Sequence, residues 1–480
     1  MSANGWEPVI GLEIHVQLST RTKMFCGCEL SFGQPPNTRT CPTCIALPGA
    51  LPVANEEAVV RAVEIGLALG CEIAPRSVFA RKNYFYPDSP KAYQISQYDE
   101  PICIGGELAG VRLTRAHLEE DAAKTIHVGG SGRIHGSAAS LVDFNRGGTP
   151  LVEIVTEPDL RGAAEAADWA RLLRETVRQL GVSDVNMEEG SLRVDANVSV
   201  RPAGSEELGT KTELKNMNSF RFIERGIDAE IARQVAILAG GGEVVQETLH
   251  FDPTSGAITS LRSKEEAHDY RYFPEPDLVP VAVTEAMIEA ARAHLPELPA
   301  ARGERYEREL GLAHDSARLL AFRAELGDFF ERALEAGAGV GGVAAQPLAN
   351  WIATELVARI GDSDPAASRV TPEAMATLVA MVTGKAISRQ AGQQVLERLV
   401  ADGGDPAAVV EAEGLAAMSD GGELDALVDA AIAANPDAAE KIRAGKGQAV
   451  GAIIGHVMRE TKGRADGGEV SRLVREKLGA

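Results

Sequence analysis

Hydrophobic and polar residues alternate along residues 9–18, VIGLEIHVQL, near the start of the chain. The two alternating sets are Leu12, Ile14, Val16 and Leu18 on one side, and Glu13, His15 and Gln17 on the other. Successive side chains of a strand point to opposite faces, so this pattern predicts a β-strand with one buried face. The polar face either contacts solvent or lines a site. This strand alone favours solvent, because antiparallel sheets commonly have one solvated face.

Further patterns predict mixed α and β structure up to about residue 290. The segment SLRVDANVSV (191–200) alternates in the same way, and LVEIV (151–155) is typical of a buried strand. The segment AADWARLLRETVRQLG (166–181) has helical spacing, with Gly181 as its expected end. We therefore expect strands and helices together in this part of the chain.

The pattern changes after PEPDLVP (274–280), where Ala-rich segments with high helix propensity dominate. Examples are TEAMIEAARAHL (284–295) and PLANWIATELVARIG (347–361). We predict an α+β protein with a mixed or antiparallel sheet in a large first domain, followed by two small all-helical domains. The expected bounds are 1–293, 294–405 and 406–480.

Length and charge restrict the class of protein. The chain has 480 residues, of which 45% are hydrophobic, and a formal net charge of −21. No apolar run approaches the roughly 20 residues that span a bilayer, so we expect a cytoplasmic protein without a membrane partner. The acidity argues against coating nucleic acid by bulk electrostatics.

The last 40 residues differ from the rest in charge. Residues 441–480 hold nine Lys or Arg against four Asp or Glu, a balance of +5, which leaves −26 for the remainder. The tail is either a basic surface for a polyanion or an ordinary solvated helical face. The sequence leaves both open.

Four cysteines form two close pairs in FCGCELSFGQPPNTRTCPTC (25–44). Cys26 and Cys28 are followed, after twelve residues, by Cys41 and Cys44. Two such pairs suit a tetrahedral zinc site, and cytosolic cysteines seldom form disulfides. We predict a structural Zn²⁺ knuckle over 26–44 in preference to four free thiols. Cys71 and Cys103 have no partner by spacing, and we expect them to be small core residues.

Carboxylates recur in segments that otherwise have an ordered pattern. They lie in HLEEDAAK (117–124), in EEGSLRVDANVSV (188–200) and in GTKTELKNMNSF (209–220). The residues concerned are Glu119 and Glu120, Asp195 and Asn197, and Lys211, Glu213 and Lys215. Carboxylates with imidazole suit Mg²⁺, and neighbouring lysines would neutralise phosphate. Each segment alone is more often a solvent face, but together with Glu13 and His15 they favour a shared site.

Aromatic and basic residues alternate in RKNYFYPDSPKAYQISQYDEP (81–101). Four of the seven tyrosines, Tyr84, Tyr86, Tyr93 and Tyr98, lie here among Lys82 and Lys91. Rings between cations can stack a base and hold its phosphate, although a loop with buried rings is an equal alternative. In DFNRGGTPLVEIVTEPD (143–159), Arg146 precedes two glycines whose backbone amides could approach an anion.

Some nucleotide and protease motifs are absent from the sequence. There is no G-x-x-x-x-G-K-[ST] phosphate loop, H-E-x-x-H or G-x-S-x-G. A G-x-G-x-x-G match at Gly337, Gly339 and Gly342 follows a predicted helix, so we exclude a dinucleotide site there.

Seven of these segments together resemble the successive signature blocks of the GatB family, the GatB subunit of the tRNA-dependent amidotransferase. They are VIGLEIHVQL, RKNYFYPDSPKAYQISQ, HLEEDAAK, DFNRGGTPLVEIVTEPD, EEGSLRVDANVSVRP, TELKNMNSFRFIERGI and DYRYFPEPDLVP. The tail GKGQAVGAIIGHVMRETKGRADGGEVSRLVREKL is similar to the family's YqeY-type terminal module. The resemblance spans essentially the whole chain.

The resemblance implies a ligase that forms a carbon–nitrogen bond. In this family, the GatB subunit uses ATP and Mg²⁺ to phosphorylate the side-chain carboxylate of Glu-tRNA(Gln) or Asp-tRNA(Asn), and ammonia then displaces the phosphate. The ammonia comes from glutamine through a partner amidase subunit, and a small third subunit completes a heterotrimer. The implied fold is a cradle-like catalytic domain related to glutamine synthetase, followed by helical domains that bind tRNA.

The resemblance also implies site residues. His15, Glu120 and Glu213 match the magnesium positions, with Glu13 and Glu119 close by. We expect Asp195, Asn197, Lys211 and Lys215 around the same cavity, and Lys82, Tyr84, Tyr86, Lys91 and Arg146 at the nucleotide or tRNA end. The zinc cysteines rest on their own spacing, since only some members of the family have them.

A scaffold that binds tRNA without catalysis is the alternative. Its zinc knuckle, aromatic loop and basic tail would hold RNA, but it would have no use for acids around a metal. The sequence has no amidase-like Ser/Lys arrangement and no G-x-C-x-G glutaminase nucleophile, so the enzyme would depend on a partner for ammonia.

Overall fold

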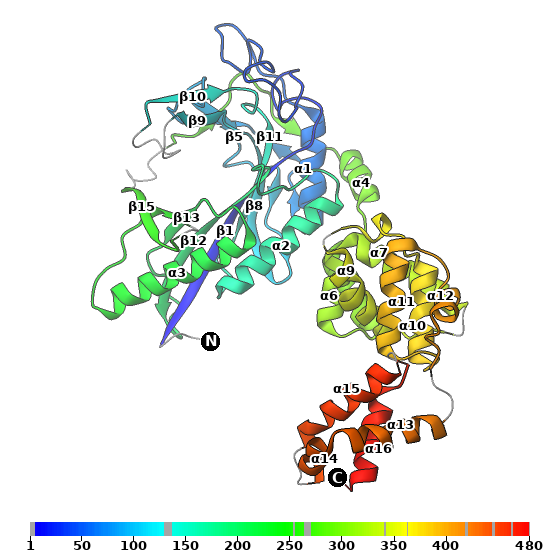
Figure 1. Cartoon of the computed structure of the whole chain (residues 1–480). Helices are drawn as coiled ribbons and strands as arrows, with labels where there is room; N and C mark the ends of the chain where they lie inside the picture. The colour runs from blue at the N-terminus through cyan, green and yellow to red at the C-terminus, as the bar shows by residue number, and fades with distance from the viewer. Residues whose placement is uncertain are drawn as a thin grey trace. The chain divides into compact units, whose positions relative to one another are not determined.

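The protein is described here by a computed structural model. It describes residues 5–128, 137–252, 255–263, 270–339, 342–361, 363–417, 421–443, 447–461 and 464–479. The chain forms two compact units, Met1–Leu298 and Pro299–Ala480. The first combines sheets with helices, and the second is helical (Figure 1).

A ten-stranded sheet is the centre of the first unit. Its strands run in the order β15-β14-β13-β12-β1-β11-β8-β6-β2, and β7 also pairs with β8. The strands are β1 (Trp6–Gln17), β2 (Glu72–Ile73), β6 (Cys103–Ile104), β7 (Glu107–Leu108), β8 (Val111–Glu120), β11 (Pro150–Thr156), β12 (Leu192–Pro202), β13 (Thr212–Lys215), β14 (Glu247–Phe251) and β15 (Ile258–Ser263). All these pairings are antiparallel except that of β13 with β14, so the sheet is mixed.

Three helices cover the apolar face of this sheet. They are α1 (Glu56–Ala68), which packs on β8, α2 (Ala163–Gln179), and α3 (Phe220–Ala239), which packs on α2 and β12 (Figure 1). Helix α4 (Glu285–His294) packs on α1. In β12 the buried Leu192, Val194 and Ala196 alternate with half-buried polar residues. The helices therefore bury one set of side chains and leave the polar set on the opposite face.

Three small sheets complete the first unit. They pair β16 (Phe273–Pro274) with β4 (Ala80–Asn83) and β5 (Tyr93–Ser96), β9 (Lys124–Val128) with β10 (Ala139–Asp143), and β17 (Val281–Ala282) with β3 (Arg76–Ser77). Arg81 of β4 donates two hydrogen bonds of 2.7 Å to the buried Glu275 just after β16. This charge-assisted pair joins segments far apart in sequence.

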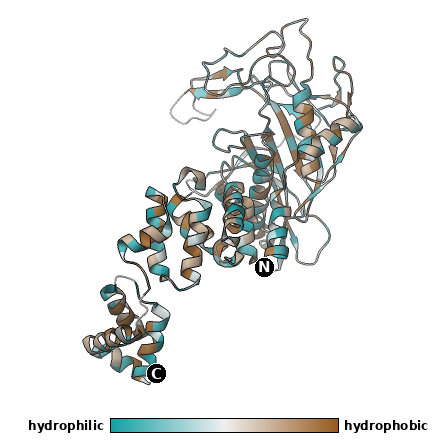
Figure 2. Cartoon of the chain, turned by 90° about the vertical axis from the view of Figure 1, so that its right-hand side faces the viewer, coloured by the Kyte–Doolittle hydropathy of each residue, from teal (hydrophilic) through white to brown (hydrophobic). Residues whose placement is uncertain are grey.

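The second unit consists of amphipathic helices whose apolar and polar sides are seen in Figure 2. The helices are α5 (Pro299–Leu310), α6 (His314–Phe322), α7 (Ala324–Ala338), α8 (Ala345–Asn350), α9 (Val357–Ile360), α10 (Pro372–Thr383), α11 (Arg389–Asp402), α12 (Pro406–Glu413), α13 (Gly421–Ala434), α14 (Pro436–Arg443), α15 (Val450–Glu460) and α16 (Gly467–Leu478), with a π-helix at Trp351–Leu356 and short 3₁₀ turns at Pro365–Ala367 and Gly447–Ala449. One apolar core draws on residues from Tyr306 to Leu415, and a second on residues from Leu424 to Leu478.

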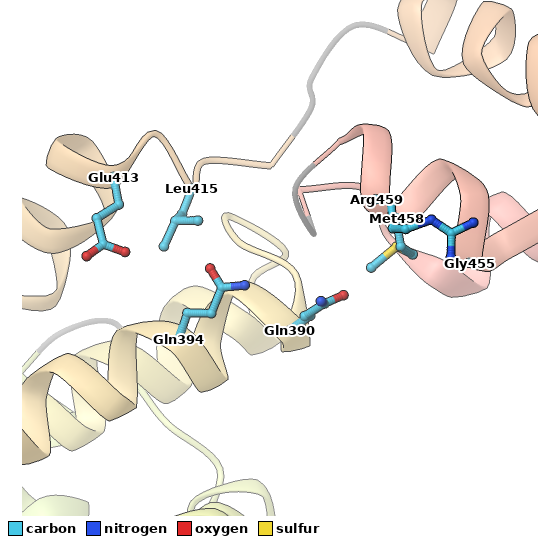
Figure 3. Close-up of a pocket in the computed structure, with 7 residues that line it drawn as sticks. All are labelled: Gln390, Gln394, Glu413, Leu415, Gly455, Met458 and Arg459. Carbon is cyan, nitrogen blue, oxygen red and sulfur yellow. The ribbon is translucent and has the colours of Figure 1, made fainter.

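A pocket in this unit is lined by side chains of α11 and α15 and the end of α12 (Figure 3). Its charged side chains are Glu413 and Arg459. No described helix of the protein is both long enough and apolar enough to cross a membrane.

The main elements expected from the sequence are confirmed. Strands occupy 9–17, 151–155 and 192–200, and the helix predicted over 166–181 ends at Gln179 before Gly181, whose φ is +68°. The coarse class is also confirmed, as a large mixed sheet followed by helices. The segment 347–361 is helical as predicted, but its middle widens into the π-helix. The division at 293 and 405 and the relation to glutamine synthetase stay predictions.

Gly66 in α1 allows the helix to pack closely on β6. A Cβ at this position would lie 2.4 Å from Cys103 Sγ and 2.8 Å from Ile73 Cδ1. Alanine would gain about 1 kcal/mol in helix propensity, but overpacking a core costs about 1–3 kcal/mol. We expect Gly66→Ala to lower the free energy of unfolding by about 1–2 kcal/mol in urea denaturation.

Two variants provide the controls for this prediction. Adding Cys103→Ala removes the nearest atom and should recover part of the loss. Gly451→Ala, in a helix with no neighbour within 4 Å, should cost nothing. A Gly66→Ala protein as stable as the parent would contradict the packing argument.

Candidate functional site

Polar side chains form a continuous row on the face of the large sheet opposite the helices. The register places His15 of β1 between Arg193 of β12 and Glu153 of β11, and Glu153 opposite His117 of β8. Residues paired directly across antiparallel strands point to the same face. The alternation predicted in β1 therefore extends over four neighbouring strands.

Imidazoles and carboxylates meet in the middle of this row, in a group that we call the acid–histidine cluster: Glu13, His15, His117, Glu119 and Glu153. His15 Nε2 lies 3.4 Å from Glu153 Oε2, 3.6 Å from Glu13 Oε1 and 3.8 Å from Glu119 Oε1. His117 Nε2 lies 3.6 Å from Glu153 and 3.9 Å from Glu119. Glu119, Glu153 and His117 are buried.

Burial and charge act against each other in this cluster. Burial disfavours the charged imidazolium of His15, but the hydrogen bond to Glu153 and the carboxylates of Glu119 and Glu13 outweigh it and raise the His15 pKa. Burial lowers the pKa of His117. Although burial opposes its charge, Glu153 has a pKa well below the usual range because of His117, His15 and Lys82. Glu153 is thus a buried carboxylate held in its charged form.

Two overlapping sets of donors in this region could hold a metal ion. One is His15, Glu119 and Glu153, and the other is Glu13, His15 and Asp195; within each set the donor atoms lie within 4.8 Å of one another. Within the described residues, the buried Nδ1 of His117 has no hydrogen-bond partner. Carboxylate oxygens with imidazole are ligands that fit a divalent cation.

The acids grouped with His15 in the structure differ from the predicted magnesium set. We predicted that His15, Glu120 and Glu213 converge, but neither acid joins a donor group with His15 in the described part of the chain. Glu120 follows Glu119 directly in β8, and consecutive strand residues point to opposite faces. Glu213 of β13 lies two strands from β1, roughly 10 Å across the sheet. Glu119 and Glu153 are the acids that form a donor group with His15, and the set His15, Glu120 and Glu213 stays a prediction.

Glu120 has a different partner. Its carboxylate forms an ion pair with Lys91 and accepts a hydrogen bond of 3.0 Å from the Ile95 backbone. The side chains of Lys91 and Glu120 are only 14% and 9% exposed. The pair joins the segment before β5 to the end of β8, and a contact of Lys91 with the nucleotide stays a prediction.

The other predicted residues of β12 and β13 lie on the same polar face as His15. Asp195 is paired with Glu13 across the strands, and Asn197 with Glu213. Lys215 Nζ lies 2.6 Å from Asp195 and 3.0 Å from Glu213. Glu213 also accepts a hydrogen bond of 2.9 Å from Thr248. The exposed Lys211 precedes β13.

The predicted nucleotide residues lie in different surroundings. Lys82 of β4 is adjacent to the cluster, since Glu119 and Glu153 raise its pKa against the effect of burial. Tyr84 and Tyr86 stack on each other with centroids 5.0 Å apart. Arg146 instead donates hydrogen bonds of 2.9 Å to the backbone oxygens of Ala122 and Ala123, so its guanidinium holds the chain.

Gln17, left unassigned by the sequence, belongs to a buried network beside the cluster. It donates a hydrogen bond of 2.6 Å to Asp121, which also accepts from Arg193 at 2.8 and 3.2 Å. Asp121 is buried, yet Arg193 and Arg146 lower its pKa against the effect of burial. The end of β8 is therefore fixed by charge pairing as well as by its ladder.

The four cysteines of the predicted knuckle converge. The Sγ atoms of Cys26, Cys28, Cys41 and Cys44 lie within 4.8 Å of one another, in a group that could bind a metal. Reciprocal hydrogen bonds attach this loop to the segment before β11. Asn37 accepts from the Phe144 amide at 2.8 Å and donates to Asp143 at 3.0 Å, and Asn145 accepts from the Arg39 amide at 2.8 Å. Cys71 and Cys103 are buried, as predicted.

Part of the basic tail engages acids of its own unit. Lys477 lies 2.8 Å from both Asp425 and Asp429, and Arg472 pairs with Glu469 and Glu476. Lys446 and Lys462 lie outside the described residues. The polyanion surface stays a prediction.

Sequence reasoning missed Glu153, His117 and Arg193. The signal for Glu153 was present, because a single acid inside the apolar run LVEIV is costly to bury without a partner. His117 lies two residues before Glu119, the spacing that places both on one strand face. Arg193 shares that spacing with Asp195.

The Lys91–Glu120 pair gives a stability prediction. Replacing one partner of a buried ion pair leaves the other charge uncompensated, at a cost of about 3–5 kcal/mol. We expect Lys91→Met to lower the free energy of unfolding by about 3 kcal/mol in urea denaturation, and Lys91→Met combined with Glu120→Met to recover most of it. A loss below about 0.5 kcal/mol in the single variant would show that water screens the pair.

Comparison with known proteins gives matches over almost the whole chain. A family model described as "GatB/GatE catalytic domain" matches residues 8–289, and one described as "GatB domain" matches residues 328–478. Three curated relatives are named as B subunits of an aspartyl/glutamyl-tRNA(Asn/Gln) amidotransferase. That of Anaeromyxobacter sp. (strain K) is 51% identical over 100% of both chains. That of Thermobifida fusca (strain YX) is 50% identical over 99% of this chain and 94% of its own. That of Halorhodospira halophila is 49% identical over 98% of this chain and 99% of its own.

The first family model covers the sheet that carries the acid–histidine cluster, and the second covers most of the helical unit. The chain therefore belongs to the GatB family, with the family's catalytic domain followed by its helical GatB domain.

Proposed function

We propose that this chain is the component of a tRNA-dependent amidotransferase that converts Glu-tRNA(Gln), Asp-tRNA(Asn) or both to the amide form with ATP. The observation that supports the proposal most is the acid–histidine cluster with Lys82 and Lys215 nearby, on the sheet face opposite the helices in the family's catalytic domain. The named relatives are subunits of such a ligase-type enzyme.

The donor set fits Mg²⁺. His15, Glu119 and Glu153 supply one nitrogen and several carboxylate oxygens, and Glu153 is held in its charged form. A magnesium ion held by these residues would neutralise the negative charge of the ATP phosphates. The lone buried Nδ1 of His117 leaves a further polar position for a water or ligand atom.

The chemistry has two steps. An oxygen of the substrate carboxylate attacks the γ-phosphorus of ATP, forming an O–P bond as ADP leaves. The nitrogen of ammonia then attacks the acyl carbon, and the C–O bond to phosphate breaks with loss of a proton to solvent. Lys82 and Lys215 hold positive charge at this face, where it would stabilise charge on the transferred phosphoryl group.

The proposed partners follow from the missing ammonia source. The sequence contains no glutaminase nucleophile pattern, so a separate amidase subunit would supply ammonia, with a small third subunit completing a heterotrimer. The naming of the relatives as B subunits agrees with a multi-subunit complex. We propose a cytoplasmic complex that acts on aminoacyl-tRNA without a membrane component.

Conservative changes in the cluster test the catalytic role. In a reconstituted three-subunit complex, Glu119→Gln and Glu153→Gln should each reduce Glu-tRNA-stimulated ATP hydrolysis by about 100-fold, because each removes a charged ligand position. Filter binding of Glu-tRNA should remain close to that of the parent. Both quantities are measured on the same preparations.

The control is Glu7→Gln, on β1 with His15 but paired with Arg201 away from the cluster. It should keep full turnover. Glu120→Gln should lower stability without changing the Mg²⁺ requirement. Full turnover in both cluster variants would favour the tRNA-binding scaffold instead.

We also propose that the cysteine loop holds a structural Zn²⁺. Four cysteine ligands would fill the tetrahedral coordination of zinc and leave no open position for catalysis. Elemental analysis of the purified chain should give one zinc per chain, lost in Cys41→Ser and retained in Cys71→Ala. A chelator should lower the unfolding temperature of the parent and leave that of Cys41→Ser unchanged. A metal-free parent of equal stability would overturn the assignment.

A further inference from the structure

Six of the seven tyrosines gather at the small β16-β4-β5 sheet, in two segments far apart in the chain. Three of them, Tyr98, Tyr270 and Tyr272, form a connected group that we call the aromatic wall. Tyr98 and Tyr272 are stacked, with centroids 4.4 Å apart and planes at 10°. Tyr270 meets Tyr272 edge-on at 6.1 Å.

The aromatic wall borders the acid–histidine cluster. Ser96, two residues before Tyr98, donates a hydrogen bond of 3.1 Å to Glu119. The ammonium of Lys82 lies 5.0 Å from the Tyr270 ring centroid. Burial, with Glu119 and Glu153, raises the pKa of Tyr272 to about 12, although Lys82 opposes this. Rings, a cation and the carboxylates thus belong to one region.

The wall is built from rings that remain accessible. Tyr98 is 47% exposed and Tyr270 is 43% exposed. The Arg115 guanidinium lies 5.6 Å from the Tyr98 centroid, and its buried Nε has no hydrogen-bond partner within the described residues. Exposed rings beside cations are what proteins use to stack a nucleobase.

The backbone behind the wall is held in a rare conformation. Arg271, between two of the tyrosines, has φ +41°, a left-handed conformation that is unfavourable for a residue with a Cβ. Asn83 stabilises it, because its side chain donates to the Tyr270 and Arg271 oxygens at 2.8 and 3.0 Å, and its amide donates to Tyr270 at 2.9 Å. The ring positions are therefore fixed by tertiary contacts.

We propose that the aromatic wall stacks an adenine ring, with the attached phosphate or ester directed towards Lys82 and the acid–histidine cluster. The inference rests on the proposed function, which supplies two sources of adenine: ATP and the 3′-terminal adenosine of the tRNA. Tyr98 and Tyr270 offer the exposed ring surface, and Tyr272 stacks on Tyr98.

The test uses the three-subunit complex with ammonium chloride as the nitrogen source. Tyr98→Leu keeps apolar bulk but removes the ring, and Tyr98→Phe keeps the ring. We expect Tyr98→Leu to raise one KM by about 10-fold, as for loss of one base–aromatic stack, and Tyr98→Phe to stay within about 2-fold. A rise in KM for ATP identifies the nucleotide, and a rise in KM for Glu-tRNA identifies the terminal adenosine. Phe32→Ala, which removes a 74% exposed ring of the cysteine loop, is the matched control.

Direct binding separates this inference from the proposed function. Fluorescence of 2-aminopurine riboside triphosphate, and of Glu-tRNA ending in 2-aminopurine, should be quenched on binding to the parent complex and to Tyr98→Phe. Quenching of one of the two should be lost with Tyr98→Leu. Equal quenching and equal KM values in a folded Tyr98→Leu complex would overturn the aromatic wall as an adenine site. A parent complex that quenches but forms no amide with ATP would overturn the proposed function alone.

Discussion

The register of β1 against its two neighbours is the constraint on which the site depends. Side chains of a strand repeat every two residues, so a slip of one position would turn His15 into the apolar core and Ile14 out of it. The ladder fixes His15 opposite Glu153 on one side and Arg193 on the other. Ile14 and Val16 are fully buried under the helices. Burial of the apolar side chains therefore fixes the register, and the register in turn fixes the positions of the polar row.

Charge balance is the second requirement of this face. Burying Glu119, Glu153 and Asp121 without partners would be unfavourable by several kcal/mol each. The structure supplies His15, His117 and Lys82 to the first two and Arg193 to the third. These partners come from β1, β8, β4 and β12, so the acidic face is stable only after distant parts of the chain have assembled. The same arrangement concentrates charge of both signs where a phosphorylated substrate would need it.

Much of the fold could be predicted from local pattern, because β1, β11, β12 and α2 each carry a clear period. The face of β1 was also predictable. The partners across the sheet were not, since register between strands far apart in sequence depends on tertiary packing. Glu119 and Glu120 show the limit: adjacent acids are equivalent in composition, but the pleat sends one to His15 and the other to Lys91. The family resemblance indicated the chemistry and the segment. Which of the two adjacent acids faces His15 depends on the alternation of side chains along β8.

The cysteine loop has a consequence for how the face responds to its surroundings. Asn37 and Arg39 of that loop hold residues 143–145, and Arg146 next to them holds the chain just after β8. The polar face is thus anchored in part through four thiols rather than through the apolar core alone. Packed apolar side chains do not react with oxidants or chelators. Thiolates can be oxidised, and a chelator can remove a metal bound to them. The proposed Zn²⁺ would therefore help to hold, through this loop and Arg146, the chain that follows the strand carrying Glu119.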